Sequence, residues 1–279
     1  MIAPQPQPVQ LEDIEIQLLL EAVYLYYGFD FRDYSQASLK RRILERMRAE
    51  NLETVSAFQD RVLHDEACLQ RLLLGLSIQV TSMFRDPSFY ATFRQKVAPL
   101  LRTYPTVRVW HAGCSTGEEV YSMAILLQEE QLYHKCRIYA TDMSADVLRK
   151  AREGIFPLSA MQEYTANYLH AGGTQEFSDY YMAHFDYAIF QPTLRTNIVF
   201  SEHNLVTDGS FNEFHVILCR NVMIYFNKAL QQRVHKLIYE SLVTLGIFGM
   251  GNKESLRFTP REDAYEQLDE HDKLYRKVR

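Results

Sequence analysis

This chain of 279 residues lacks long apolar runs, closely spaced cysteine pairs and a large excess of one charge sign. No run approaches the roughly 18–20 apolar residues that a helix needs to cross a bilayer, so we expect no direct membrane insertion. The four cysteines form no Cys-x-x-Cys, which favours reduced thiols in the cytoplasm. The nine histidines show no metal-ligand spacing, so we expect no metal. A net charge of −5 argues against nucleic-acid binding through the overall field.

Strand patterns are also missing before residue 105. Met1–Gln10 is rich in proline and glutamine and lacks the features of a signal peptide, so residues 1–10 are expected to be a disordered lead-in. Apolar residues then recur at helical spacing, which predicts an N-terminal helical domain over 11–80. The predicted helices are 11–27, ending at Gly28, then 38–50, 54–63 and 66–76. Residues 81–104 are interpreted as a linker and a helix.

Strands and helices alternate after Pro105, which predicts an α/β domain over 105–279 with a mostly parallel sheet covered by helices on both faces. The predicted strands are 107–111, 136–142, 197–201, 214–219 and 246–250, and the predicted helices are 118–131, 145–153 and 228–242. Residues 172–196 interrupt this alternation with aromatic-rich segments, which we interpret as a small inserted antiparallel β-subdomain. Sheets of this kind bind ligands beyond the carboxyl ends of their strands.

A glycine loop, Gly113-Cys-Ser-Thr-Gly117, separates the first predicted strand from its helix. No lysine follows Gly117, which excludes a P-loop. The helix opens with Glu118-Glu119, which would repel a pyrophosphate. A cofactor with a cationic amino acid part, such as S-adenosylmethionine, suits these carboxylates better. The alternative is that the two glutamates only complement the helix dipole.

Asp142 ends the second predicted strand, 25 residues after Gly117. An acidic side chain at this place can accept hydrogen bonds from both ribose hydroxyls. Its alternative role is to cap the helix that follows, beside Ser144. Together, the glycine loop, the acidic helix start and Asp142 favour a positively charged cofactor that contains adenosine.

Four segments resemble one known family, the bacterial chemoreceptor glutamate methyltransferases, or CheR family. They are Thr81-Ser-Met-Phe-Arg-Asp-Pro87, His111-Ala-Gly-Cys-Ser-Thr-Gly-Glu-Glu-Val-Tyr-Ser122, Ala140-Thr-Asp-Met-Ser-Ala-Asp-Val-Leu148 and Leu218-Cys-Arg-Asn-Val-Met-Ile-Tyr-Phe226. The last segment is long and unusual, which makes it the most specific of the four. The resemblance runs from about Leu39 to the C-terminus.

The resemblance implies an S-adenosylmethionine-dependent O-methyltransferase that esterifies glutamate side chains on the cytoplasmic signalling domains of chemoreceptors and releases S-adenosylhomocysteine. It implies a helical N-terminal domain joined to a Rossmann-like domain with an inserted antiparallel β-subdomain. Separately from the resemblance, we expect a monomeric, cytoplasmic protein. The segment between Asp142 and Asn204 is a few residues longer than in relatives that tether to a receptor's C-terminal pentapeptide, so we expect a non-tethering member.

The resemblance also assigns roles to individual residues. It implies that Glu119 holds the methionine ammonium and Asp142 the ribose, and that Arg85 and Tyr225 lie beside the transferring methyl as the catalytic pair. The other implied cofactor contacts are Gln79, where the family often has Asn, with Thr81, Gly113, Asn204, Leu205, Cys219, Arg220 and Asn221.

A basic cluster on the predicted helix 38–50 is interpreted as a receptor-docking surface, because the expected substrate is an acidic helical bundle. Its members are Arg41, Arg42, Arg46 and Arg48. The alternative is an ordinary solvated helix face. Two other functions stay open: a methyltransferase for another substrate, and a non-catalytic module that senses S-adenosylmethionine or S-adenosylhomocysteine.

Overall fold

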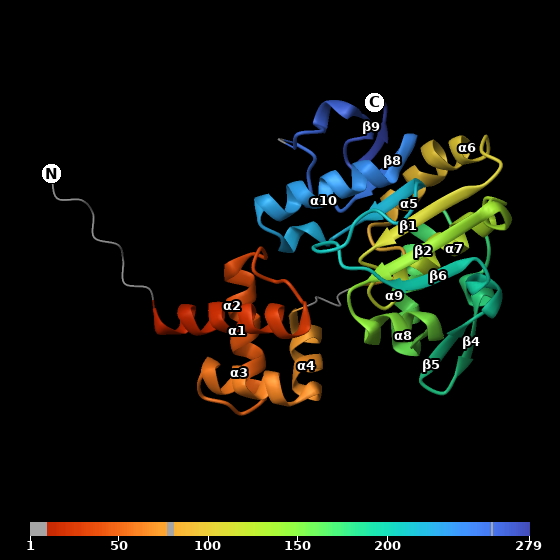
Figure 1. Ribbon diagram of the computed structural model, residues 1–279. Coiled ribbons are helices and arrows are strands. Elements are labelled where there is room, and N and C mark those ends of the chain that lie inside the picture. Colours follow the sequence, from red (N-terminus) through yellow and green to blue (C-terminus); the bar gives the residue numbers. More distant parts are fainter. Residues whose placement is uncertain (1–9, 77–80, 258) are drawn as a thin grey trace. The chain divides into compact units, whose positions relative to one another are not determined.

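The computed structural model describes residues 10–76, 81–257 and 259–279 (Figure 1). Most of the predicted lead-in, and the predicted site residue Gln79, lie outside the described residues. The chain divides into two compact units. One comprises Met1–Ile78 with Tyr225–Leu230, and the other comprises Gln79–Ile224 with Gln231–Arg279.

The helical unit contains four helices in its described part: α1 (Leu11–Tyr27), α2 (Gln36–Ala49), α3 (Val55–His64) and α4 (Glu66–Leu76). The prediction of helices here is confirmed. Helix α1 ends before Gly28, as predicted. Gly28 adopts a left-handed φ of 80° and donates its N–H to the carbonyl of Tyr24, which closes the helix. Helix α1 packs on α3, and α2 packs on α4.

A distant segment completes the helical unit. Tyr225–Leu230 joins it through an antiparallel bridge between Tyr34 and Phe226. Two further backbone bonds fix the segment, from the N–H of Ser35 to the carbonyl of Tyr225 and from the N–H of Asn227 to that of Asp33, both at 2.8 Å. The sequence analysis, which placed 105–279 in one domain, did not foresee that this segment packs with the helices.

The second unit is built on a seven-stranded sheet in the order β6-β2-β1-β7-β8-β10-β9. The first five strands in that order run parallel to their neighbours, as predicted, and β10 and β9 are antiparallel. The strands are β1 (Val107–Ala112), β2 (Cys136–Asp142), β6 (Ile198–Glu202), β7 (Phe214–Cys219), β8 (Leu242–Met250), β9 (Tyr265–Asp269) and β10 (Leu274–Lys277).

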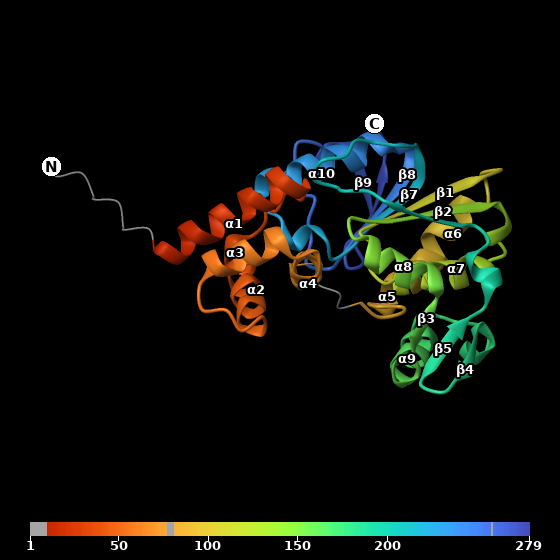
Figure 2. The same ribbon diagram turned by 60° about the horizontal axis from the view of Figure 1, so that its bottom comes forward.

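Helices cover both faces of this sheet. Figure 2 shows α7 (Glu118–Glu129) and α8 (Ala145–Glu153) on one face and α10 (Lys228–Ser241) on the other. This follows from right-handed crossovers, because the chain moves outward from β1 to β6 in one direction and from β7 to β8 in the other. Two short helices, α5 (Pro87–Thr92) and α6 (Ala98–Leu101), precede β1 and flank a π-helical turn, Phe93–Val97.

A small antiparallel sheet interrupts the second unit, in the order β3-β5-β4. The hairpin of β4 (Tyr181–His184) and β5 (Tyr187–Phe190) lies where an inserted β-element was predicted. Its third strand, β3 (Ile155–Pro157), and the helix α9 (Met161–His170) lie outside the predicted range of 172–196. The buried carboxylate of Glu129 on α7 fastens this element, because it accepts hydrogen bonds from the hydroxyls of Tyr168 and Tyr180.

Candidate functional site

The glycine loop joins β1 to α7 at the carboxyl ends of the strands. Gly113 and Gly117 both have left-handed φ angles, of 79° and 97°. A Cβ at Gly113 would lie 2.7 Å from Val222, and one at Gly117 would lie 3.0 Å from Ala151. In the structure, backbone conformation and packing against the protein itself already require these glycines.

Asp142 holds this loop. Its carboxylate accepts hydrogen bonds from the backbone N–H of Ser115 at 2.9 Å and from that of Ser144 at 3.1 Å. Burial raises the pKa of Asp142, against the opposing effect of these donors. The bond from Ser144 supports the capping alternative, and the bond to the loop adds a second role. Because each carboxylate oxygen can accept more than one bond, capacity remains for ligand hydroxyls.

A buried charge cluster lies at the start of α7. The guanidinium of Arg220 is ion-paired with Glu119 at 3.0 Å and with Asp86 at 2.9 Å. His111 Nδ1 lies 2.9 Å from the other oxygen of Glu119. Burial opposes ionisation of Glu119, but the bond from His111 and the charge of Arg220 outweigh it and hold the pKa of Glu119 below its ordinary value. Two carboxylates therefore share the guanidinium of Arg220.

Arg85 lies next to this cluster, on a strained segment. Phe84 and Asp86 have left-handed φ angles of 50° and 56°, which non-glycine residues rarely adopt. The bond from the N–H of Phe84 to Ser122 Oγ, at 2.8 Å, holds the segment on α7. The backbone carbonyl of Arg85 accepts from Arg220 at 3.3 Å. Thr81, four residues earlier, is half-buried.

The loop after β7 depends on Glu254, a residue that the sequence analysis missed. One oxygen of Glu254 accepts from the N–H of Val222 at 3.0 Å and of Met223 at 2.8 Å. The other accepts from Asn221 at 3.1 Å and from Gly251 at 2.7 Å. Burial raises the pKa of Glu254, against the opposing effect of these four donors. Four donors suit an ionised carboxylate, because a proton on either oxygen would displace one of them.

Glu254 thereby shapes the segment with the most specific resemblance. Asn221 has a left-handed φ of 60°, directly after Arg220. Cys219, at the end of β7, is buried, and burial raises the pKa of its thiol well above the ordinary value, which suits a packing residue. The signal that could have revealed Glu254 is weak: a lone acid four residues after the last strand of the parallel set.

Two of the implied cofactor contacts, Asn204 and Leu205, follow the edge strand β6. Strand β6 pairs with β2, so that Glu202 lies opposite Asp142. Asn204 caps its own turn, because its side-chain oxygen accepts from the N–H of Val206 at 3.0 Å, and Leu205 is buried. Asp142 and Asn204 thus follow neighbouring strands, on one edge of the sheet.

The predicted docking arginines divide into two groups on α2. Arg41 and Arg48 are exposed, and Arg46 is partly buried with an ion pair to Glu50 at 3.5 Å. The assignment of Arg42 to an exposed surface is corrected. Its side chain is only 8% exposed, donates to the carbonyl of Leu76 at 2.5 Å, and lies over the ring of Tyr225. The spacing placed it on a flank of the helix, and the segment around Tyr225 covers that flank.

The residues at the glycine loop fit S-adenosylmethionine. The carboxylate of Glu119 suits a cationic amino acid group. Two buried polar atoms here have no hydrogen-bond partner in the described structure, Ser115 Oγ and His111 Nε2. Buried polar atoms are normally paired, so these mark places where a ligand can bind. Among the described residues, no group of three His, Cys, Asp or Glu side chains could hold a metal ion.

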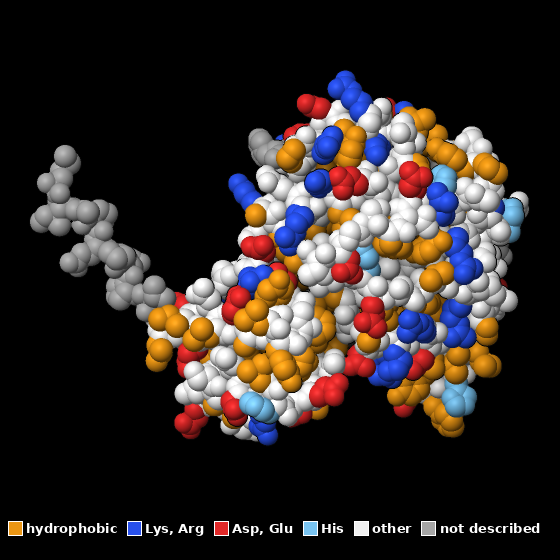
Figure 3. Space-filling model, viewed as in Figure 1, with side chains coloured by type: hydrophobic (Ala, Val, Ile, Leu, Met, Phe, Trp, Pro, Cys, Tyr) orange, Lys and Arg blue, Asp and Glu red, His pale blue; other side chains and the backbone are white. Residues whose placement is uncertain are grey.

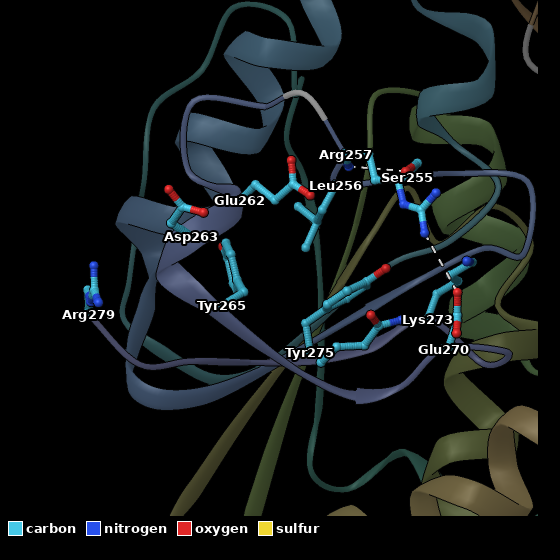
Figure 4. A pocket seen from close by; sticks show the side chains of 11 residues that line it. Ser255, Leu256, Arg257, Glu262, Asp263, Tyr265, Glu270, Lys273, Tyr275 and Arg279 are labelled. Carbon is cyan, nitrogen blue, oxygen red and sulfur yellow. Dashed lines mark hydrogen bonds and ion pairs between the residues drawn. The ribbon is translucent and has the colours of Figure 1, made fainter.

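A cavity of about 580 Å³ lies elsewhere, beside the β9–β10 hairpin (Figure 4). Its walls mix acids and bases, and Arg257 is paired with Glu270 at 3.7 Å. None of its lining residues is a predicted site residue. The charge balance gives no preference for a charged ligand, in contrast to the cluster at Glu119.

Fold and site together define an S-adenosylmethionine-dependent methyltransferase, and sequence comparison gives the family. The pattern described as "CheR methyltransferase, SAM binding domain" matches residues 79–272, and "CheR methyltransferase, all-alpha domain" matches 14–77. The chain belongs to the CheR methyltransferase family.

Relatives agree. A Pseudomonas putida KT2440 protein that carries the name methyltransferase Cher3 is 50% identical, over 95% of this chain and 97% of its own length. The chemotaxis protein methyltransferase of Listeria monocytogenes is 29% identical over 85% and 91% of the two chains. That of Salmonella typhimurium is 27% identical over 92% and 88%. No helix in the described residues combines the length and apolarity needed to span a membrane.

Proposed function

We propose that this chain transfers a methyl group from S-adenosylmethionine to glutamate side chains on the cytoplasmic signalling domains of chemoreceptors. Membership of the CheR family and the name "chemotaxis protein methyltransferase" carried by relatives support this substrate. The observation that carries the proposal is that the buried Arg220 contacts both the carboxylate of Glu119 and the backbone of Arg85. It joins a site for a cationic donor to an arginine suited to an anionic acceptor.

The reaction requires little acid–base help from the protein. A glutamate carboxylate, with a reference pKa of about 4.3, is already ionised at neutral pH. When bound, S-adenosylmethionine supplies a methyl group on a cationic sulfur. A carboxylate oxygen forms the new bond to the methyl carbon as the carbon–sulfur bond breaks, and that electron pair returns to sulfur, leaving a neutral thioether and an ester. No proton is transferred, so no general base is assigned.

The residues of this chain therefore bind and orient the methyl donor and the acceptor carboxylate. Glu119 holds the donor's ammonium, and Asp142 holds the ribose hydroxyls. Arg85 pairs with the incoming carboxylate, and the hydroxyl of Tyr225 donates to the oxygen that does not attack. Opposite charges disappear in this step, which a dry site favours. The remaining proposed cofactor contacts are Gln79, Thr81, Gly113, Asn204, Leu205, Cys219, Arg220 and Asn221.

We propose that Arg41 and Arg48, with Arg46 at their flank, dock on the acidic surface of the receptor. Their exposure supports this role. On the face seen in Figure 3, Lys and Arg side chains are interspersed with Asp and Glu. Such a pattern favours a local docking patch over the broad basic surface of a nucleic-acid-binding protein.

Methyl transfer to a purified receptor signalling domain tests the proposal. The donor carries a tritiated methyl group, and base treatment of the product should release volatile methanol, as an ester does. A receptor domain whose candidate glutamates are replaced by alanine is the control. We expect label on the first domain and background on the second. Label that survives base, or equal label on both domains, would contradict glutamate esterification.

A further inference from the structure

Arg42 stands apart from the other arginines of α2 because its charge is turned inward. The guanidinium carbon lies 5.0 Å from the centre of the Tyr225 ring, in the range of a cation–π contact. The same group donates to the carbonyl of Leu76 at 2.5 Å, at the end of α4. Arg42 therefore links α2, α4 and the segment Tyr225–Leu230 within the helical unit.

The backbone around Tyr225 is fixed to the start of the same helix. Ser35, the residue before α2, donates its N–H to the carbonyl of Tyr225 at 2.8 Å. Phe226 packs edge-on against Tyr34, with ring centres 4.9 Å apart. Asn227 bonds to Asp33 through both its backbone and its side chain. The backbone of Tyr225 is thus held from one side, and its ring is held by Arg42.

This contact also orients the tyrosine hydroxyl. Burial lowers the pKa of Arg42, and a hydrogen bond with the Tyr225 side chain opposes that shift. A guanidinium can only donate, so the hydroxyl accepts from it and keeps its own proton to donate elsewhere. A hydroxyl that accepts from a cation is also a stronger donor, because the two bonds polarise one another.

We propose that Arg42 is a positioning residue for Tyr225: it fixes the ring that carries the proposed catalytic hydroxyl, and it does not touch the receptor. This inference rests on the proposed function, since it assigns Tyr225 to the reacting carboxylate. It separates two tasks on one helix. The outward arginines, Arg41 and Arg48, bind the receptor, and the inward one serves the chemical step.

The test compares Arg42→Met with Arg41→Met and Arg48→Met in the full chain. These substitutions remove the same guanidinium and leave a side chain of similar length. Steady-state methylation of the receptor domain at saturating donor gives kcat and KM, and calorimetry gives the affinity for S-adenosylmethionine. We expect Arg42→Met to lower kcat by about tenfold to a hundredfold, the range for small misplacements in an active site, with KM and donor affinity within about twofold.

The controls at exposed positions, Arg41→Met and Arg48→Met, should show the opposite pattern, with a raised KM for the receptor domain and an unchanged kcat. A raised KM with unchanged kcat for Arg42→Met, or no change in either, would overturn the inference. Thermal unfolding identifies a variant that fails to fold. In that case Arg42→Lys, which keeps a donor for Leu76 but lacks the planar fork, replaces it and is expected to show the same fall in kcat.

A readout without activity separates this inference from the proposed function. Fluorotyrosine placed at position 225 reports its surroundings by fluorine NMR. Arg42→Met should shift that resonance, and Arg41→Met should leave it in place. A shifted resonance in a chain that methylates no receptor would reject the proposed substrate and keep the contact. An unshifted resonance in an active chain would reject the role of Arg42.

Discussion

The loops that follow β1 and β7 leave neighbouring strands of one sheet, yet different means hold them. The loop after β1 contains Gly113 and Gly117, which tolerate their left-handed φ angles, and Ser115, whose left-handed φ of 50° is accompanied by a bond from its N–H to Asp142. The loop after β7, Arg220–Met223, has no glycine, and its left-handed residue is Asn221. Four N–H groups in and beside it converge instead on Glu254.

This difference has a physical basis. Glycine removes the steric cost of a turn at the turn itself, so two of the three left-handed residues in the loop after β1 need no distant partner. A buried carboxylate instead satisfies backbone donors from a distance in the sequence, and the cost of losing it is larger. The two loops also touch, because Val222 fills the space beside Gly113. We expect both to be needed for cofactor binding, with the loop after β7 the more sensitive.

Glu254→Gln should have the largest effect. Its amide would turn N–H groups toward backbone N–H groups, leaving buried donors unpaired. We expect a loss of about 3 kcal/mol in the free energy of unfolding and a fall in affinity for S-adenosylmethionine of at least about tenfold. Urea denaturation and calorimetry measure the two. Glu163→Gln, at an exposed position on α9, is the control and should change neither. Wild-type values for Glu254→Gln would refute the role assigned to this carboxylate.

Gly113→Ala should have an intermediate effect. The new methyl would lie 2.7 Å from Val222, at a backbone φ that alanine disfavours. We expect a loss of about 2 kcal/mol in the free energy of unfolding. Val222→Ala in the same chain should recover the steric part and leave the backbone part. Gly209→Ala, where no atom lies within 4 Å of the new methyl, is the control. If Val222→Ala recovers nothing, the two loops are not in the contact described.

Glu118→Gln should have the smallest effect at acidic pH, where Glu118 is protonated in both the folded and the unfolded state, and its signature is a change in the pH dependence of stability. Glu118 follows Gly117, and its carboxylate accepts from the hydroxyl of Thr116 at 2.7 Å. Burial raises the pKa of Glu118 from 4.5 to about 7. Between these values the folded state binds more protons than the unfolded state, so Glu118 makes the protein less stable as pH rises. Its neighbour Tyr164, whose pKa burial raises, stays protonated throughout this window.

The glutamine variant lacks this titration. Its free energy of unfolding, relative to the wild type, should therefore increase as the pH rises from 4.5 to about 7. Urea denaturation at a series of pH values measures the difference. Parallel profiles for the two proteins would show that Glu118 is not held in its protonated form.

Local patterns account for what could be predicted of the fold. The helix 11–27 and its end at Gly28, and the strand 136–142, follow from spacing and from one terminal residue. The last two strands were missed, because Tyr265–Asp269 is a partly exposed edge strand with polar residues in its middle. Helix α9 was missed because it belongs to the inserted element, where the regular alternation of strands and helices is interrupted and so does not predict a helix.

The site residues likewise divide into those that a local motif predicts and those that only long-range contacts bring to the site. The cluster of Glu119 with Arg220 involves residues that their own motifs mark. Glu254 could not be predicted from spacing, because three of the four N–H groups it binds are supplied by residues more than thirty positions earlier. Arg42 and Arg41 are adjacent and chemically identical, and only the packing of Tyr225–Leu230 distinguishes them. Long-range contacts of this kind leave no local pattern to read.

A crystal structure with S-adenosylhomocysteine bound would test the central claim most directly. The account predicts the ammonium against Glu119, the ribose hydroxyls on Asp142, and the sulfur facing Arg85 and Tyr225. A ligand bound elsewhere, or one whose amino acid end lies away from Glu119, would contradict it.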